Sequence, residues 1–114
     1  MVAVTYVPCR GDVVWIDLDP TKGHEQSGRR PAVVISPRAY NKISNRALFC
    51  PITTKVKGYV FEVSLEGKSI TGAILVDQVR TLDWSKRGVA FIEKAPLAVV
   101  DQVEAKLLTL IRAE

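Results

Sequence analysis

The stretch PTKGHEQSGRRPAVVISP, residues 20–37, decides the fold, because a polar loop there runs directly into an uninterrupted apolar strand. Gly23 and Gly28 permit backbone angles that residues with side chains resist, so the loop can fold over a ligand. Pro31 pushes the preceding residue towards an extended conformation, which predicts that Arg30 lies rigidly at the mouth of the strand. The loop carries more hydrogen-bonding side chains than a turn requires: His24, Glu25, Gln26, Ser27, Arg29 and Arg30. This surplus predicts a site.

Length and composition are those of one globular domain, residues 1–114. The chain is 47% hydrophobic and 25% charged, ordinary values for a protein with a packed core. Its longest apolar runs are far below the roughly 20 residues that cross a bilayer, and its first residues lack the order of a signal peptide. We therefore expect a cytoplasmic protein with no membrane contact.

The ionisable residues favour an anionic partner over a metal. Cys9 and Cys50 match none of the paired spacings of zinc or redox motifs, and the chain has a single histidine, so we expect no metal site and no cofactor. The net charge is +4, and basic residues gather in the first half of the chain. Such a surface attracts phosphate chains or acidic peptides.

Hydrophobic periodicity predicts six short strands and one helix. Alternating or continuous apolar residues indicate strands over residues 12–18, 32–36, 47–53, 59–65, 72–82 and 89–93. Residues 96–112 change to three- and four-residue spacings, which indicate an amphipathic helix beginning at a proline. Residues 38–46 form a polar connection with room for a helical turn. The pattern predicts a mainly β fold, a small antiparallel barrel or half-barrel closed by a C-terminal helix.

Two strands carry residues that disagree with their pattern. Pro51 cannot donate to a ladder, so it predicts an edge or a bulge in the strand over residues 47–53. Asp77 and Gln78 lie inside the apolar strand over residues 72–82 and need polar partners. We interpret them as a network that supports the site.

The polar residues at strand ends suit a phosphodiester. Transesterification by a ribose 2′-OH needs a group that takes its proton, a group that protonates the leaving 5′ oxygen, and donors for the charge that develops on the phosphoryl oxygens. Arg30 and Arg29 offer planar forks of donors, and the hydroxyls of Thr53 and Thr54 offer more. Arginine is a poor proton carrier, so Glu25 and His24 both remain candidates for the general base.

Three segments carry a resemblance to a known family. The segments GDVVWIDLDPTKGHEQSGRRPAVVISP, PITTKVKGY and ILVDQVRTLDW resemble the MazF/PemK toxin endoribonucleases, in matching order over nearly the whole chain. The resemblance implies an SH3-like β-barrel of the CcdB/Kid/MazF type and a homodimer. It implies metal-independent cleavage of single-stranded RNA at a short sequence, leaving a 2′,3′-cyclic phosphate and a 5′-hydroxyl. It also implies a cognate antitoxin whose acidic, disordered tail covers the RNA groove.

The resemblance assigns roles residue by residue. The family's essential arginine falls on Arg30, its essential threonine on Thr53 and its loop glutamate on Glu25, which we take as the catalytic residues. The substrate-binding residues that we expect are His24, Gln26, Arg29, Lys55, Lys57, Gln78 and Arg80. The RNA sequence that is cut is not set by these assignments, and an ACA preference like that of well-known relatives is a guess.

Structural roles compete with several of these assignments. Arg30 could form an ion pair with Asp77 or Glu62. We favour Trp15 as a core or dimer-interface residue over a base-stacking platform. Trp84 could contact RNA or antitoxin, or equally cover the end of the barrel.

Two hypotheses follow from the sequence. The first is a dimeric endoribonuclease toxin. The alternative is a non-enzymatic toxin or binding module of the same fold, such as a CcdB-like gyrase poison or a passive RNA binder, because fold alone does not settle function. The combination of Arg30 and Thr53 favours the first, since a protein-binding poison has no evident need for both.

Overall fold

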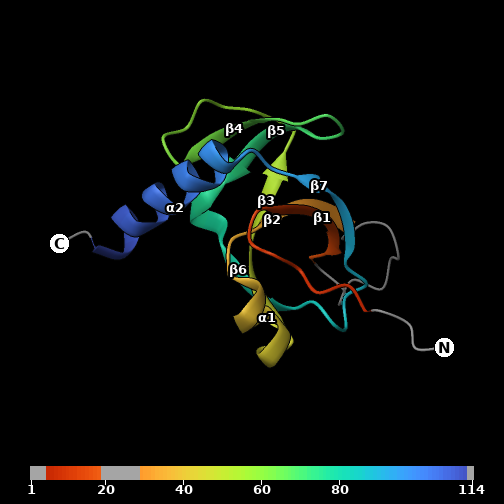
Figure 1. The fold of residues 1–114 in the computed structure, drawn as a ribbon. Coiled ribbons are helices and arrows are strands. Elements are labelled where there is room, and N and C mark those ends of the chain that lie inside the picture. The colour runs from red at the N-terminus through yellow and green to blue at the C-terminus, as the bar shows by residue number, and fades with distance from the viewer. Residues whose placement is uncertain (1–4, 19–28, 113–114) are drawn as a thin grey trace.

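A computed structural model describes residues 5–18 and 29–112, which form one curled antiparallel sheet and two helices (Figure 1). The strands are β1 (Asp12–Asp17), β2 (Arg29–Val34), β3 (Arg46–Thr53), β4 (Glu62–Glu66), β5 (Thr71–Leu75), β6 (Arg80–Asp83) and β7 (Ala90–Lys94). The helices are α1 (Arg38–Ser44), α2 (Leu97–Arg112) and a short 3-10 turn, η2 (Val76–Gln78). The predicted half-barrel with a C-terminal helix is confirmed. No helix in the described ranges is long and apolar enough to cross a membrane.

The strand order is β4-β5-β3-β2-β1-β7, and β6 also pairs with β3. β3 is the centre of the sheet, because β6 pairs with its first half at residues 46–49 and β5 pairs with its end at Ile52 and Thr53. β3 is therefore not an edge strand, and the prediction that Pro51 marks an edge is wrong. Pro51 lies in a central strand, at the last pair with β2 and between the segments that pair with β6 and β5.

Apolar residues on both faces of the sheet are buried in two clusters. One contains Val13, Val33 and Cys50 and is covered by Val103 of α2. The other contains Val14, Ala32 and Phe49, and it is closed by Leu82 and Trp84. Burying a side chain of this size stabilises the fold by about 1.5–3 kcal/mol. The aliphatic residues of β1 are thus buried on both faces of the sheet.

The predicted strand over residues 72–82 is wrong, because the chain breaks into β5, η2 and β6. Asp77 and Gln78, the polar residues that disagreed with the strand pattern, lie in η2 and are exposed. The break lets the chain leave the end of β3 and return to pair with its beginning. A side chain that needs water cannot continue a buried strand, and here the backbone turns instead.

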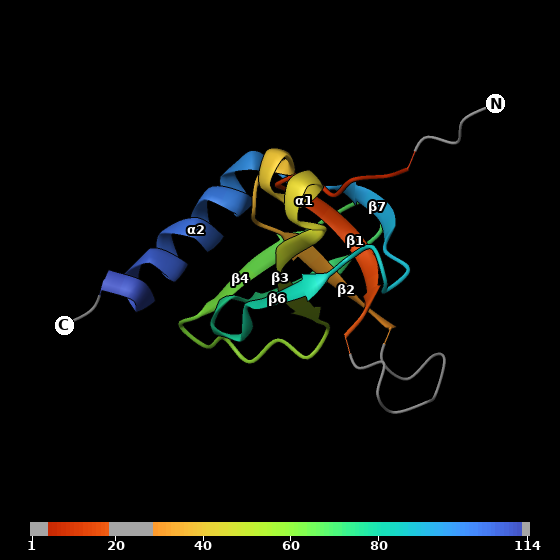
Figure 2. The ribbon, with the colours of Figure 1, turned by 90° about the horizontal axis from the view of Figure 1, so that it is seen from below.

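Other boundaries move by a few residues. The predicted strand over residues 59–65 begins only at Glu62, and β2 begins at Arg29, so both loop arginines are strand residues. The polar connection after β2 is the helix α1. The predicted helix over residues 96–112 begins at Leu97, and its last turns stand clear of the sheet (Figures 1 and 2).

Candidate active site

Arg30 and Thr53 come from neighbouring strands at the point where those strands part. β2 and β3 pair from Val34 and Phe49 to Ala32 and Pro51. Beyond that pair Arg30 stays with Ile16 of β1, whereas Thr53 pairs with Ala73 of β5. Two residues past the last common pair, Arg30 and Thr53 therefore stand on opposite sides of an opening in the sheet.

This opening is a pocket of about 390 Å³, which we call the arginine pocket. One side is formed by Trp15, Arg30 and Pro31, and the other by the end of β3 and the beginning of β5. The lining residues of that second side are Ile52, Thr53, Thr54, Lys55, Ser69, Ile70 and Thr71. Arg30 is exposed and Thr53 is half-buried, so a guanidinium and a hydroxyl face one solvent-accessible space.

Thr53 is held closely by its neighbours. Its Oγ1 accepts a hydrogen bond from the backbone N–H of Lys55 at 3.1 Å, so the hydroxyl proton can be donated to a ligand. On β5, a Cβ atom at Gly72 would lie 2.2 Å from the carbonyl oxygen of Thr53, and only glycine fits this approach. The threonine is thus fixed in position before any ligand arrives.

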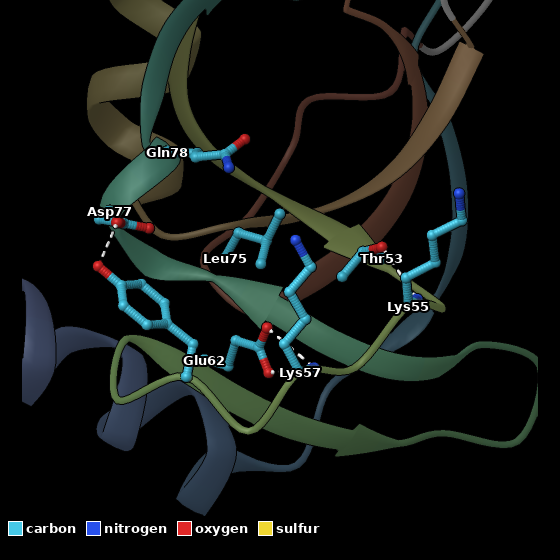
Figure 3. Close-up of a pocket in the computed structure, with 8 residues that line it drawn as sticks. Thr53, Lys55, Lys57, Glu62, Leu75, Asp77 and Gln78 are labelled. Atoms are coloured by element: carbon cyan, nitrogen blue, oxygen red, sulfur yellow. Dashed lines mark hydrogen bonds between the residues drawn. The ribbon is translucent and has the colours of Figure 1, made fainter.

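A second pocket of about 620 Å³ adjoins the first and shares Thr53 and Lys55 with it (Figure 3). We call it the lysine pocket. Its remaining lining residues are Lys57, Tyr59, Glu62, Leu75, Asp77 and Gln78. Because Thr53 and Lys55 line both pockets, the two are neighbours, and we call them together the groove.

Hydrogen bonds fix the loop that forms one wall of the lysine pocket. The Glu62 carboxylate accepts the backbone N–H groups of Lys57 and Gly58 at 3.0–3.3 Å. The Tyr59 hydroxyl donates to Asp77 Oδ2 at 3.3 Å, and the charge of Asp77 raises the pKa of Tyr59. The carboxylates of Glu62 and Asp77 therefore both accept hydrogen bonds from other groups of the same protein. Sequence reasoning missed Tyr59 because it placed this residue inside a strand, whereas the strand begins only at Glu62. It missed Glu62 because strand alternation does not show that this carboxylate binds the preceding loop.

A family model described as "PemK-like, MazF-like toxin of type II toxin-antitoxin system" matches residues 9–111. The chain belongs to this family. It is 45% identical over 106 residues to the endoribonuclease toxin MazF of Escherichia coli K12, covering 93% of this chain and 96% of that protein. It is 36% identical over 107 residues to the endoribonuclease PemK of E. coli, covering 90% and 80%. The predicted family is confirmed, and so is the class of enzyme at the level of the family.

Solved structures of MazF proteins share the fold. MazF of Deinococcus radiodurans matches with a TM-score of 0.85 and 44% identity, over 94% of this chain and 98% of that one. The MazE–MazF complex of the same organism matches with a TM-score of 0.83 and 39% identity, over 94% and 97%. These matches extend the family assignment from the sequence to the arrangement of the strands.

Of the ten predicted site residues, Arg30, Thr53 and Lys55 line the arginine pocket, and Lys57 and Gln78 line the neighbouring lysine pocket. His24, Glu25 and Gln26 lie outside the described residues, so their roles stay predictions.

Arg29 and Arg80 line neither the arginine pocket nor the lysine pocket. Arg29 donates from Nη1 to the Gly88 carbonyl at 3.2 Å, and Arg80 donates from Nη1 to the Leu18 carbonyl at 2.9 Å. Arg87, which the sequence did not single out, donates to the Asp17 carbonyl at 2.9 Å. Arg80 and Arg87 thus hold backbone at the end of β1, and Arg29 ties the start of β2 to the turn before β7.

The competing structural roles now have outcomes. Among the described residues, Arg30 forms an ion pair with neither Asp77 nor Glu62. Trp15 is 37% exposed and lines the arginine pocket, so its indole is not a core side chain. Trp84 is buried and donates from Nε1 to the Asn41 carbonyl at 3.0 Å, so it covers the end of the barrel and is no surface contact.

Metal ligands do not gather in the part of the chain that the structure describes. Within residues 5–18 and 29–112, no three side chains of His, Cys, Asp or Glu lie close enough to hold a metal ion. The two cysteines are both free thiols, Cys9 half-buried and Cys50 buried. Burial first, and then the charge of Asp77, raise the pKa of the Cys50 thiol to about 12.

Proposed function

We propose that this chain is a toxin endoribonuclease that cleaves single-stranded RNA at a short sequence without a metal ion, with Arg30 and Thr53 acting on the scissile phosphate. The observation that carries the proposal is the arginine pocket, in which both side chains face one open space at the junction of the groove. An unpaired strand could lie along the groove with one phosphate between them.

The chemistry is an internal transesterification. A base removes the proton of the ribose 2′-OH, the 2′ oxygen bonds to phosphorus, and the bond from phosphorus to the 5′ oxygen breaks. The leaving oxygen takes a proton, so the products are a 2′,3′-cyclic phosphate and a 5′-hydroxyl. Arg30 neutralises the charge that develops on the phosphoryl oxygens, and the Thr53 hydroxyl donates to one of them. Glu25 and His24 remain the two candidates for the base.

The rest of the groove would bind the neighbouring nucleotides. Lys55 and Lys57 carry exposed ammonium groups along the path of the backbone, where each phosphate contact adds salt-dependent affinity. The Gln78 side-chain amide both donates and accepts, so it can read the edge of an unstacked base. Arg29 and Arg80 act on RNA indirectly in this scheme, because Arg29 binds the Gly88 carbonyl and Arg80 binds the Leu18 carbonyl.

An antitoxin would oppose this activity by occupying the same groove. A relative of this chain is solved as a MazE–MazF complex, and the groove here is open and flanked by lysines. An acidic antitoxin tail that lies along Lys55 and Lys57 would exclude RNA from the groove. Inhibition of cleavage by an acidic antitoxin peptide should weaken as salt rises.

Homodimerisation is the remaining part of the proposal. Large apolar side chains are exposed on α2, among them Leu97 at 69% and Ile111 at 68%. A surface of this kind is expected to be covered by a second copy or a partner. Light scattering at micromolar concentration tests this, and a monomeric mass would contradict it.

The decisive experiment incubates the protein with a long RNA in excess EDTA and maps the cut ends. We expect cleavage at recurrent short sequences, with cyclic phosphate on the upstream fragments. Arg30→Ala should abolish it, whereas Arg38→Ala, at an arginine on α1 that is also exposed, should leave it unchanged. Absence of cleavage in EDTA, or undiminished cleavage by Arg30→Ala, would overturn the proposal.

A further inference from the structure

The Glu93 carboxylate binds three successive backbone N–H groups of the turn between β4 and β5. Its Oε1 accepts from Lys68 at 3.0 Å and from Ser69 at 3.2 Å, and its Oε2 accepts from Ser69 at 3.2 Å and from Ile70 at 3.0 Å. Successive N–H groups that point to one side form a concave anion site. Here the anion comes from the chain itself, from a residue more than twenty positions away.

The turn is shaped to receive this carboxylate. The Gly67 N–H donates to the Ile70 carbonyl at 2.9 Å and closes the turn. A Cβ atom at Gly67 would lie 2.2 Å from Glu93 Oε2 and 2.7 Å from the Ile70 oxygen. Any side chain at this position would therefore push the carboxylate out, so glycine is required by the contact.

Glu93 joins the two ends of the curled sheet. β4 and β7 are the first and last strands of the order, and Glu93 lies on β7 while the turn follows β4 (Figure 1). Strand pairing does not link these two strands in the described sheet. At this place the half-barrel is held closed by one side chain and not by a ladder.

The opposite side of the same turn is a wall of the proposed RNA groove. Ser69, Ile70 and Thr71 line the arginine pocket across from Arg30. Glu93 lies behind them, in a smaller hollow that Glu66, Lys68 and Lys94 also line. Displacing the turn would therefore change the shape of the pocket without removing any side chain that lines it.

We propose that Glu93 is a positioning residue for RNA binding: by clamping the three N–H groups of the β4–β5 turn, it fixes the wall of the arginine pocket opposite Arg30. This inference rests on the proposed function for its substrate. Of the lysines that line the same hollow, Lys68 attracts the carboxylate, whereas Lys94 forms an ion pair with Asp12 at 2.6 Å. The backbone donors, at fixed positions, provide the directional part of the contact.

The test compares two variants that break the contact from its two sides. Glu93→Gln keeps the size of the side chain but turns an amide N–H₂ towards backbone donors, and Gly67→Ala displaces the carboxylate from the turn. Glu104→Gln is the matched control, an exposed carboxylate on α2 that lines neither the groove nor the hollow around Glu93. Each protein is assayed for hydrogen exchange at residues 68–70, for its dissociation constant with a non-cleavable 2′-O-methyl RNA pool, and for KM and kcat on cleavable RNA.

We expect both variants to exchange these amides faster and to bind RNA about tenfold more weakly, the change that loss of one charge-assisted hydrogen bond produces. KM should rise with kcat nearly unchanged, because the turn shapes binding and not the reacting groups. The double variant should bind no worse than either single variant. The control should match the wild type.

The outcomes separate this inference from the proposed function. If the wild type cleaves RNA but Glu93→Gln keeps its KM and dissociation constant, the positioning role is wrong. If kcat falls at constant KM, the variant has only lost folded protein, and the inference is again overturned. If the wild type binds RNA without cutting it and Glu93→Gln weakens that binding, the nuclease proposal fails while the role of Glu93 is supported.

Discussion

Replacing Thr53 by valine separates the chemistry of the hydroxyl from its structural role. Valine keeps the branched shape that a strand favours, so β3 and its pairing with Ala73 should survive. The lost hydroxyl leaves the N–H of Lys55 without its acceptor, but this residue is exposed and water can replace the bond. The free energy of unfolding should therefore fall by no more than about 1 kcal/mol.

The cost in the transition state is expected to be larger. If the Thr53 hydroxyl donates to a phosphoryl oxygen as charge develops there, its removal should lower kcat by about 10²–10³-fold, or about 2.7–4 kcal/mol. Thr53→Ser keeps the donor and should retain most of the activity. Thr81→Val, at an exposed position on β6 outside the groove, is the matched control and should behave as the wild type.

The assay is cleavage of a fluorophore-and-quencher RNA in excess EDTA, with thermal unfolding measured on the same samples. Large loss of kcat with a small change in unfolding temperature would support the role of the hydroxyl. The reasoning is refuted if Thr53→Val stays within about threefold of the wild type, a difference under 1 kcal/mol. It is also refuted if Thr53→Ser is as inactive as Thr53→Val.

Three further predictions concern the scaffold. Trp84→Phe removes the indole N–H that binds the buried Asn41 carbonyl and should lower the free energy of unfolding by about 1–3 kcal/mol in urea titrations, with kcat retained. Cys50, whose thiol pKa is raised to about 12 by burial and by Asp77, should resist iodoacetamide at pH 8 in the folded protein and react once it is unfolded. For Glu93, burial acts to raise the pKa, but three backbone N–H bonds outweigh it and the pKa is lowered. Its contribution to stability should thus be complete above the pKa of the unfolded state and vanish as the pH falls through the lowered one, so the wild type should lose more thermal stability than Glu93→Gln between neutral and acidic pH.

The sequence predicted most of this architecture because its apolar pattern is strong. The strands over residues 12–18 and 47–53 and the helix over residues 96–112 each match an observed element within about two residues. Arg30 was predicted from its place before Pro31 at the start of a strand, whereas the role of Thr53 came from the family resemblance.

The errors have one physical origin. Periodicity reports which residues are apolar, but it does not show where a chain changes its partner strand. Residues 72–82 are apolar enough for one strand, yet the backbone turns at Asp77 and Gln78, and Tyr59 precedes β4 instead of lying in it. Tyr59, Asp77 and Gln78 line the lysine pocket, so a prediction that assigned these residues to strands could not foresee the pocket. The contact of Glu93 joins residues far apart in the sequence, and no local pattern encodes it.

The groove exists because the sheet divides at two prolines. Pro31 and Pro51 each lack an N–H, and they lie next to the last pair that β2 and β3 share, Ala32 with Pro51. From there β2 continues with β1, which carries Arg30 one way, and β3 continues with β5, which carries Thr53 the other. A regular ladder across this point would close the arginine pocket and bury the hydroxyl. The missing donors thus explain the irregularity of the sheet, and they place the two proposed reacting groups on either edge of an opening between strands that stay paired on their outer sides.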